Sequence, residues 1–186
     1  MHPINAIYSV WTLWVVTWVL AAVWSARTAA RPSPVRALPY YIFVFAGASM
    51  LIAAPANAPT LWPVGDTLGW TLAALTAAGF LLSWWARFHL GALWSGPVTK
   101  KEGHRVIDTG PYRFVRHPIY TGIILASFAT AAAKATPIAL AGAAIMAFGW
   151  YLKARLEERF LRAELGADAY AAYAARVPML LPFSPV

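Results

Sequence analysis

The sequence contains no cysteine, and only seven of its 186 residues are acidic. The absence of cysteine excludes disulfide bonds, thiolate nucleophiles and cysteine-ligated metals. Charged residues of either sign make up only 12% of the chain, against 60% hydrophobic residues, and this balance is too apolar for an ordinary soluble domain. We therefore expect an integral membrane protein, with a single domain over residues 1–186 because the length suits no more than one.

The few charges are mostly basic, which gives the chain a net charge of +8. A basic excess can indicate nucleic-acid binding, but here the lysines and arginines are confined to a few loops and to the C-terminal region. In a membrane protein such confinement encodes orientation. We therefore expect membrane lipids as partners and no nucleic acid.

Long uncharged runs predict an all-α fold with about five transmembrane helices. The first run, residues 7–26, has about the 20 residues needed to cross the hydrocarbon core and lacks the cleavage site of a signal peptide. Asp66 is the expected N-cap of the third helix. Residues 1–63 hold the first two helices and a proline-containing break, and residues 64–186 hold the rest. The predicted spans are residues 7–26, 38–54, 67–90, 118–133 and 136–152.

The last two spans are short and rich in alanine and glycine. Small residues let helices approach closely in a membrane, so we expect these two spans to pack as a hairpin, with Gly122 and Gly142 at packing positions. Five spans also place fourteen of the 15 basic residues on one side of the membrane and only Lys134 on the other. The positive-inside rule then predicts an N-terminus outside and a C-terminus in the cytoplasm.

Polar chemistry is concentrated in residues 104–120, HRVIDTGPYRFVRHPIY. Proline suits the first position of a helix, so Pro118 is expected to begin the fourth span. The positive end of that helix would face Arg116 and His117, which makes a basic corner that attracts anions. Gly110 and Pro111 are expected to form a turn that directs Tyr112.

A second polar region follows the fifth span. The segment KARLEERFLRAELG, residues 153–166, is amphipathic, and Glu157 and Glu158 stand together where a membrane helix leaves the lipid. Gly166 is the expected end of this helix, and a short helix should follow it before Pro178. Tyr170 and Tyr173 on that short helix are interpreted as packing residues rather than site residues.

The order of these motifs, GHRVIDTGPYRFVRHPIYTG, an apolar hairpin and then EERFLRAELGADAYAAYAARVPMLLP, resembles the isoprenylcysteine carboxyl methyltransferase family. The resemblance also extends to a wider group of membrane methyltransferases that includes phospholipid methyltransferases. It covers residues 84–183. It implies an enzyme that uses S-adenosyl-L-methionine, held in a cytoplasmic pocket between the central loop and the helix after the hairpin. No strand precedes a Gly-rich motif, so a soluble Rossmann methyltransferase is not supported.

The resemblance also implies roles for individual residues. Trp94 and Lys153 are candidates for substrate contact, although the family pattern has Arg where this chain has Lys153. No metal is expected, because no third or fourth ligand accompanies the histidines at metal spacing. The catalytic candidates are Arg116, His117 and Glu157, and the cofactor-binding candidates are His104, Arg105, Val106, Ile107, Gly110, Pro111, Tyr112, His117, Pro118, Tyr120, Glu157 and Glu158.

The chemistry of the cofactor suggests how these residues would divide the work. The cofactor brings its own electrophilic methyl group, so the protein must mainly align the reactants and exclude water. Arg116 and His117 suit its carboxylate, Glu157 or Glu158 its ammonium or ribose hydroxyls, and aromatic side chains such as Tyr112 its adenine or sulfonium. A carboxylate acceptor would need no general base, whereas an amine would need one, for which His104 or a glutamate is the candidate.

The leading hypothesis is methyl transfer to a lipid-like or prenylated acceptor, with carboxyl O-methylation favoured by the resemblance. Three alternatives remain open: phospholipid N-methylation, a nicotinamide-dependent membrane reductase, and a non-enzymatic scaffold whose basic loops bind anionic lipid. Phospholipid N-methylation would differ from the leading hypothesis in its product, and a reductase would differ in its cofactor. A scaffold would tolerate alanine at His104, Tyr112 and Glu157.

Overall fold

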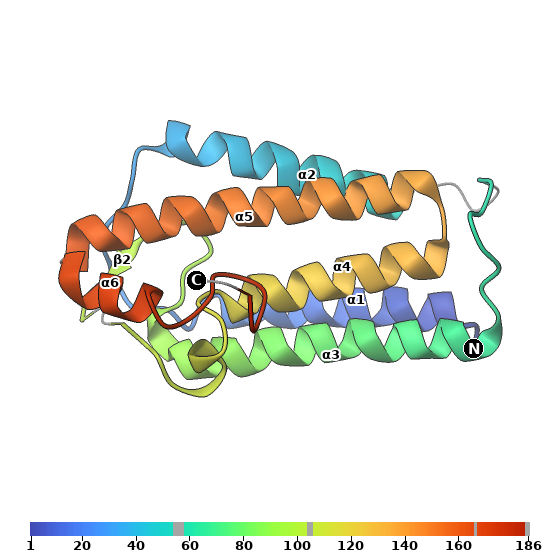
Figure 1. The fold of residues 1–186 in the computed structure, drawn as a ribbon, viewed down its shortest axis with the longest axis horizontal. Helices are drawn as coiled ribbons and strands as arrows, with labels where there is room; N and C mark the ends of the chain where they lie inside the picture. The colour runs from blue at the N-terminus through green and yellow to red at the C-terminus, as the bar shows by residue number, and fades with distance from the viewer. Residues whose placement is uncertain (54–57, 104–105, 166, 185–186) are drawn as a thin grey trace.

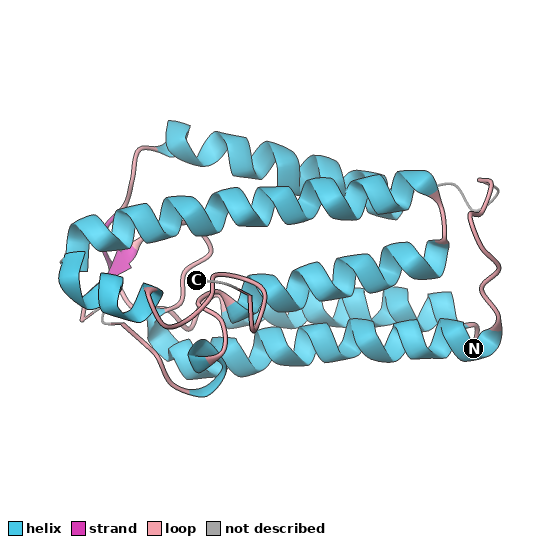
Figure 2. Ribbon diagram, viewed as in Figure 1, coloured by secondary structure: helices cyan, strands magenta, loops and turns pink. Residues whose placement is uncertain are grey.

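A computed structural model describes residues 1–53, 58–103, 106–165 and 167–184. Five long helices run along one axis, and helices account for most of the described residues (Figures 1 and 2). A short helix, α6, follows the last long helix at one end of the bundle. The α-helices are α1 (Pro3–Ala21), α2 (Leu38–Ala53), α3 (Asp66–Leu90), α4 (Pro118–Lys134), α5 (Pro137–Leu165) and α6 (Ala167–Ala174).

Short elements connect the helices at one end of the bundle. A two-stranded antiparallel pair joins the loop after α1 to the loop after α3, with Thr28 opposite Lys101. These short elements are β1 (Thr28–Ala30), β2 (Lys100–Lys101) and the 3₁₀ helices η1 (Pro34–Ala37), η2 (Gly91–Leu93) and η3 (Gly110–Arg113).

The bundle is built from two tightly packed helix pairs, α2 with α5 and α3 with α4, while α1 lies against α3. Glycines allow the close approach in both pairs. A Cβ on Gly122 of α4 would collide with the carbonyl oxygen of Gly79 on α3, and one on Gly142 of α5 would lie 2.8 Å from the carbonyl oxygen of Gly47 on α2. The hairpin helices α4 and α5 thus use these two small residues against α3 and α2, and not against each other as the sequence suggested.

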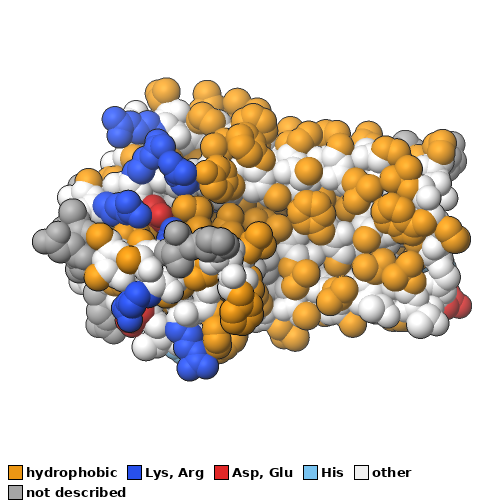
Figure 3. All heavy atoms as spheres, viewed as in Figure 1, with side chains coloured by type: hydrophobic (Ala, Val, Ile, Leu, Met, Phe, Trp, Pro, Cys, Tyr) orange, Lys and Arg blue, Asp and Glu red, His pale blue; other side chains and the backbone are white. Residues whose placement is uncertain are grey.

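Four helical segments are long and apolar enough to cross a membrane, namely Pro3–Ala21, Pro34–Ala53, Asp66–Leu93 and Pro137–Ala163. The fifth long helix, α4, has 17 residues, which is about the lower limit for a crossing. Hydrophobic side chains cover the surface along the length of the helices (Figure 3). The protein is an all-α integral membrane protein, as expected, with length and composition supporting four spans in the described residues.

Helix boundaries differ from the predicted ones in several places, including the start of α1, which is Pro3 rather than residue 7. Asp66 is the first helical residue rather than the N-cap, which is Gly65. Helix α5 continues to Leu165 without a break, because residues 153–165 contain neither glycine nor proline and consist largely of good helix formers. The amphipathic segment is therefore part of the fifth helix, and Gly166, its predicted end, lies outside the described residues.

Helix α1 ends at Ala21, five residues before the predicted end at residue 26. Arg87 of α3, which is 1% exposed, accounts for the shift. Its guanidinium donates to the carbonyl oxygens of Ala21, Trp24 and Gly91 at 3.0, 2.6 and 2.6 Å. These bonds give the carbonyls of the turns that follow α1 and α3 a further donor and join the ends of the two helices.

Basic side chains gather at the end of the bundle that carries α6, opposite the N-terminus (Figures 1 and 3). At the other end, Lys134 closes α4, and its ammonium donates to the carbonyl oxygens of Leu51 and Ile52 at the end of α2, both at 2.9 Å. The charge asymmetry seen in the sequence is therefore an asymmetry of the folded molecule.

Candidate active site

A pocket opens at the basic end of the bundle, between the end of α3, the central loop, the start of α4, the lower part of α5 and α6. It encloses about 90 Å³, below the roughly 300–1,000 Å³ of sites that bury a whole small molecule. A ligand of nucleoside size would therefore also fill the mouth or displace lining side chains. Of the predicted site residues, those that line the pocket are Trp94, Val106, Ile107, Tyr112, Arg116, His117, Tyr120 and Glu157.

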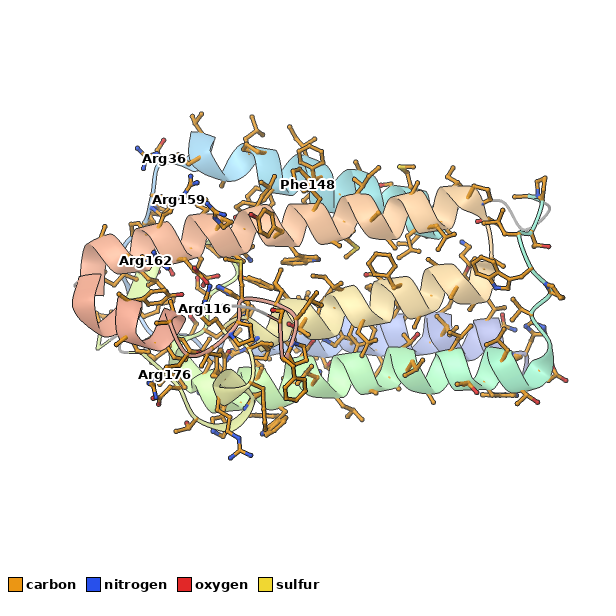
Figure 4. The ribbon with its side chains drawn as sticks, viewed as in Figure 1. Arg36, Arg116, Phe148, Arg159, Arg162 and Arg176 are labelled. Carbon is orange, nitrogen blue, oxygen red and sulfur yellow. The ribbon has the colours of Figure 1, made fainter. Side chains whose placement is uncertain are left out.

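Arg116 links three parts of the chain behind the pocket (Figure 4). Its Nε donates to Oε1 of Glu158 at 2.7 Å, and its Nη2 donates to Oε2 at 3.3 Å. Its Nη1 donates to the carbonyl oxygens of Ala174, the last residue of α6, and of Val177 beyond it. Most of the donors of this guanidinium are thus used within the protein, so the side chain positions α4, α5 and the C-terminal segment relative to one another.

Residues 177–181 form a C-terminal strap across the start of α4. The amide of Arg116 donates to the carbonyl of Pro178 at 2.9 Å, and the amide of His117 donates to that of Met179 at 3.1 Å. The hydroxyl of Thr121 donates to the carbonyl of Leu180 at 2.7 Å. The backbone amides that lead into the predicted anion-attracting corner are therefore already bonded to the strap.

The neighbouring acids Glu157 and Glu158 have different surroundings. Glu158 is 4% exposed and lies against three basic side chains, since its carboxylate also approaches His117 Nε2 at 3.2 Å and Arg162 Nη2 at 3.6 Å. Glu157 is more open, with 26% of its side chain exposed, and its Oε2 accepts a hydrogen bond from Tyr120 Oη at 2.7 Å. Glu157 lines the pocket and Glu158 does not, so only the first has a carboxylate available to a ligand.

Aromatic rings form much of the pocket wall. The imidazole of His117 stacks on the ring of Tyr120, with centroids 5.3 Å apart, and Tyr120 stacks on Trp150 at 5.0 Å. Tyr173 on α6 donates from Oη to the carbonyl oxygen of Tyr112 at 2.7 Å. Burial raises the pKa of the Tyr112 and Tyr173 hydroxyls above the ordinary value, so both remain neutral hydrogen-bond donors at physiological pH.

Thr99 supplies an unused polar group. Thr99 is 5% exposed and lines the pocket. Its Oγ1 is buried without a hydrogen-bond partner in the described part of the chain. Buried hydroxyls are rarely left unpaired in folded proteins. Together with the Glu157 carboxylate and the aromatic wall, this hydroxyl makes a set that fits a ligand carrying hydroxyl, cationic and aromatic groups, as S-adenosyl-L-methionine does.

The remaining predicted site residues that the structure describes lie outside the pocket lining. Gly110 has a φ of 56°, and a Cβ there would meet the ring of His89 at 2.5 Å, so glycine is required by the turn before η3. Pro111 and Pro118 are fully buried and lie in the first turns of η3 and α4, respectively. Glu158 is engaged with Arg116 as described, and His104 and Arg105 lie outside the described residues.

Lys153 is buried on α5, away from the pocket lining. Its ammonium donates to the carbonyl oxygen of Gly96 at 2.6 Å and lies 5.1 Å from the ring centre of Tyr120 and 5.2 Å from that of Trp150. It therefore supports the loop after α3 and the aromatic wall. A direct substrate contact would require it to leave these partners.

Several lining residues were not among the candidates from sequence. Tyr170 and Tyr173, interpreted there as packing residues, are buried and also face the pocket. Their spacing of three residues on a short helix places both on one face, which was the available indication. The other lining residues outside the candidate set are Leu90, Leu93, Ser95, Thr99, Ile119 and Leu161, of which only Ile119 and Leu161 lie within the quoted motifs.

The fold and the site together define a helical integral membrane protein with a polar, aromatic pocket at its basic end. The model of the isoprenylcysteine carboxyl methyltransferase (ICMT) family matches residues 72–163 of the sequence. The chain belongs to this family. The matched segment runs from α3 through α5 and so includes the Arg116 corner and both glutamates, but not α6 with Tyr170 and Tyr173.

Individual relatives fall into two groups by name. The chain is 30% identical over 87 residues to protein-S-isoprenylcysteine O-methyltransferase B of Arabidopsis thaliana, covering 46% of this chain and 44% of that protein. It is 36% identical over 136 residues to methanethiol S-methyltransferase of Mycobacterium tuberculosis, covering 69% and 51%. It is 31% identical over 165 residues to methanethiol S-methyltransferase 1 of Bradyrhizobium diazoefficiens, covering 81% and 55%. The chain thus spans about half the length of these relatives.

Proposed function

We propose that this protein is an S-adenosyl-L-methionine-dependent methyltransferase whose cofactor binds in the pocket at the basic end of the bundle. The observation that carries the proposal is the Glu157 carboxylate, which is held by Tyr120 Oη at 2.7 Å and lines a pocket walled by aromatic rings. Carboxylates and aromatic faces both attract cationic groups. Membership of the ICMT family supports the same reading.

The chain's own residues would bind, orient and shield the reactants. Glu157 would accept hydrogen bonds from an ammonium or from ribose hydroxyls, and Thr99 Oγ1 would gain the partner that it lacks. Tyr112 and Trp94 would offer ring faces to adenine or to the sulfonium. Bound S-adenosyl-L-methionine supplies the electrophilic methyl group, and exclusion of water by these side chains favours its transfer to the acceptor over its loss by hydrolysis.

Arg116 has a positioning role in this proposal. Its bonds to Glu158 and to the carbonyls of Ala174 and Val177 hold α5 and α6 at the start of α4, where His117 and Tyr120 enter the pocket. His117 would contact the cofactor, since it lines the pocket and its ring stacks on Tyr120.

We propose a lipid-like or prenylated acceptor that reaches the pocket from the bilayer, with carboxyl O-methylation at the cytoplasmic face and the N-terminus outside. The name of the Arabidopsis relative supports a prenylated carboxyl acceptor. A carboxylate is ionised at neutral pH and needs no general base. The gathering of basic side chains at the pocket end (Figure 3) supports a cytoplasmic pocket through the positive-inside rule.

Methylation of a thiol is the second candidate. It is favoured by the two methanethiol methyltransferases, whose alignments cover 69% and 81% of this chain, compared with 46% for the Arabidopsis relative. A thiol has a pKa near 8.5 and reacts as the thiolate. Glu157 is then the group in the pocket that would accept the proton.

Calorimetry with S-adenosylhomocysteine tests cofactor binding in purified protein. We expect binding by the wild type and a loss of about tenfold or more in affinity for Glu157→Gln, because a hydrogen bond to a charged group contributes about 1.5–3 kcal/mol. Glu102→Gln is the matched control, since Glu102 is exposed and does not line the pocket. A wild type that binds NADPH and not S-adenosylhomocysteine would contradict the proposal and support a reductase.

The acceptor is tested separately with a labelled methyl donor. A prenylated cysteine and a short alkyl thiol are offered in parallel, and a base-labile ester is distinguished from a base-stable thioether. An ester formed only on the prenylated acceptor supports O-methylation, and a thioether formed from the thiol supports the second candidate.

A further inference from the structure

A second groove lies on the other side of α5 from the pocket. It has a volume of about 620 Å³ and runs between the segment leading into α2 and the outer face of α5. Residues four apart on a helix share a face, so Arg155 and Arg159 line this groove, while Glu157 and Leu161 point to the pocket. The two sites are therefore separate.

Three arginines, Arg36, Arg155 and Arg159, converge on the groove, and none of the described residues that line it is acidic. Figure 4 shows Arg36, just before α2, and Arg159 on α5 at the same side of the molecule. Within the described part of the chain, none of the three forms an ion pair with a carboxylate, and Arg155 donates only to the Tyr151 hydroxyl at 2.9 Å. Three uncompensated guanidiniums in one groove favour an anionic ligand that accepts several hydrogen bonds, which phosphate does.

Tyr40 gives an independent indication of a ligand. Tyr40 is 3% exposed and lines the groove. Its hydroxyl is buried without a hydrogen-bond partner among the described residues. Lys153 lies over its ring at 5.6 Å, which adds positive charge beneath the groove. A buried phenol without a partner is unusual, and a phosphate oxygen would accept its hydrogen bond.

An apolar surface continues from the groove along the seam between α2 and α5. Tyr151 at the edge of the groove stacks on Phe148, which packs edge-on against Phe43 of α2. Phe148 is 46% exposed and lies nearer the start of α5 than Arg155 and Arg159 do, away from the basic end of the bundle (Figure 4). The basic side chains and this apolar seam meet at the boundary seen in Figure 3.

We propose that this groove binds an anionic glycerophospholipid of the leaflet at the basic end. Its phosphate contacts Arg36, Arg155, Arg159 and Tyr40, and an acyl chain lies along the seam that contains Phe148. Charge complementarity selects the anionic headgroup, and the apolar seam selects a lipid over free phosphate. Binding here requires neither the cofactor nor methyl transfer.

The test is a binding measurement on the full chain in neutral detergent, by native mass spectrometry with added lipid. We expect phosphatidylglycerol to bind at least about tenfold more tightly than phosphatidylcholine, and the double substitution Arg155→Gln with Arg159→Gln to remove that preference, because a basic residue near an anionic lipid contributes about 1 kcal/mol. The matched control is Arg113→Gln with Arg176→Gln, which removes two exposed charges outside the groove at the same end. It should leave the preference within about twofold of the wild type.

Two further arms keep the result decisive. Tyr40→Phe removes only the unpaired hydroxyl and should weaken phosphatidylglycerol binding severalfold while leaving phosphatidylcholine binding unchanged. Inorganic phosphate should not compete with the lipid at equal concentration. Equal losses in the two double variants, or competition by inorganic phosphate as strong as that by lipid, would overturn the proposal.

Discussion

Glu157 and Glu158 are adjacent in sequence, yet the fold gives them separate tasks. Successive residues on a helix point about 100° apart, so one carboxylate faces the pocket and the other faces Arg116. The carboxylate of Glu158 compensates buried positive charge, whereas that of Glu157 accepts a hydrogen bond from the neutral Tyr120 hydroxyl and lies 3.8 Å from His117 Nδ1. This difference decides which acid is available to a ligand and which one supports the fold.

We expect Glu158→Gln to lower the free energy of unfolding by about 3 kcal/mol, because loss of one partner from a buried ion pair leaves the other charge uncompensated. Glu157→Gln should change it by less than about 1 kcal/mol, since its partially exposed carboxylate loses only part of one hydrogen bond. Denaturant unfolding of both variants in the same detergent, without ligand, provides the measurement. Similar losses in the two variants would show that the pair is not divided in this way.

At the scale of single residues, the sequence pointed to many of the residues that line the pocket, but not to which of them bond to each other and which face a ligand. The resemblance assigned the motif around Arg116 and the paired acids to one pocket, and the structure brings residues that are 42 and 37 positions apart within hydrogen-bond distance. That Arg116 and Glu158 would largely satisfy each other could not be predicted, because it depends on helix rotation. Thr99 has no motif, and its unpaired hydroxyl is visible only in three dimensions.

At the scale of the helices, the contact between α3 and α4 fixes the depth at which the Arg116 corner sits. Gly79 and Gly122 allow the two backbones to touch, and Ser83 Oγ donates to the carbonyl oxygen of Ile119 at 3.1 Å. This contact involves Ile119 and Gly122, in the same first two turns of α4 as Tyr120. A shift of α4 along α3 would therefore move the pocket residues away from Glu157.

We expect Gly122→Ala to destabilise the protein by about 1–3 kcal/mol, because the added methyl meets backbone of α3 that cannot move aside without separating the helices. Gly96→Ala is a suitable control, since a Cβ there meets the Trp94 ring at 3.8 Å, an ordinary contact. Thermal unfolding followed by tryptophan fluorescence measures both variants. Equal stability of Gly122→Ala and the wild type would mean that the two helices do not approach as closely as described.

Helix positions were largely predictable from the apolar runs, whereas helix ends were not. Hydrophobicity located all five long helices, but it ended the fifth at residue 152, where lipid-facing character stops. Backbone propensity continued the helix to Leu165, because charged residues such as Arg155 and Glu158 are good helix formers. Likewise, the end of α1 depends on Arg87, a distant residue that donates to the carbonyl of its last residue, Ala21, and to that of Trp24 beyond it.

For the whole molecule, polarity is divided along the bundle axis. The pocket, the arginine groove and the strap all lie at one end, and the N-terminus and Lys134 lie at the other. The strap was not predictable, because residues 177–181 carry no periodic pattern and are held by backbone hydrogen bonds to Arg116 and His117. The end-to-end charge difference, in contrast, follows from the sequence once the helices are placed.

This axial asymmetry leads to a prediction of orientation that the absence of cysteine makes simple to test. Single cysteines are introduced by Thr60→Cys, between α2 and α3 at the N-terminal end, and by Glu102→Cys, after β2 at the basic end; both side chains are exposed. Because basic loops are retained in the cytoplasm, a membrane-impermeant maleimide should label Thr60→Cys in right-side-out vesicles and should label Glu102→Cys only after permeabilisation. Complete labelling of both in detergent controls for reactivity. The reverse pattern in intact vesicles would place the pocket on the outer face, where the positive-inside rule could not account for the arginines around it.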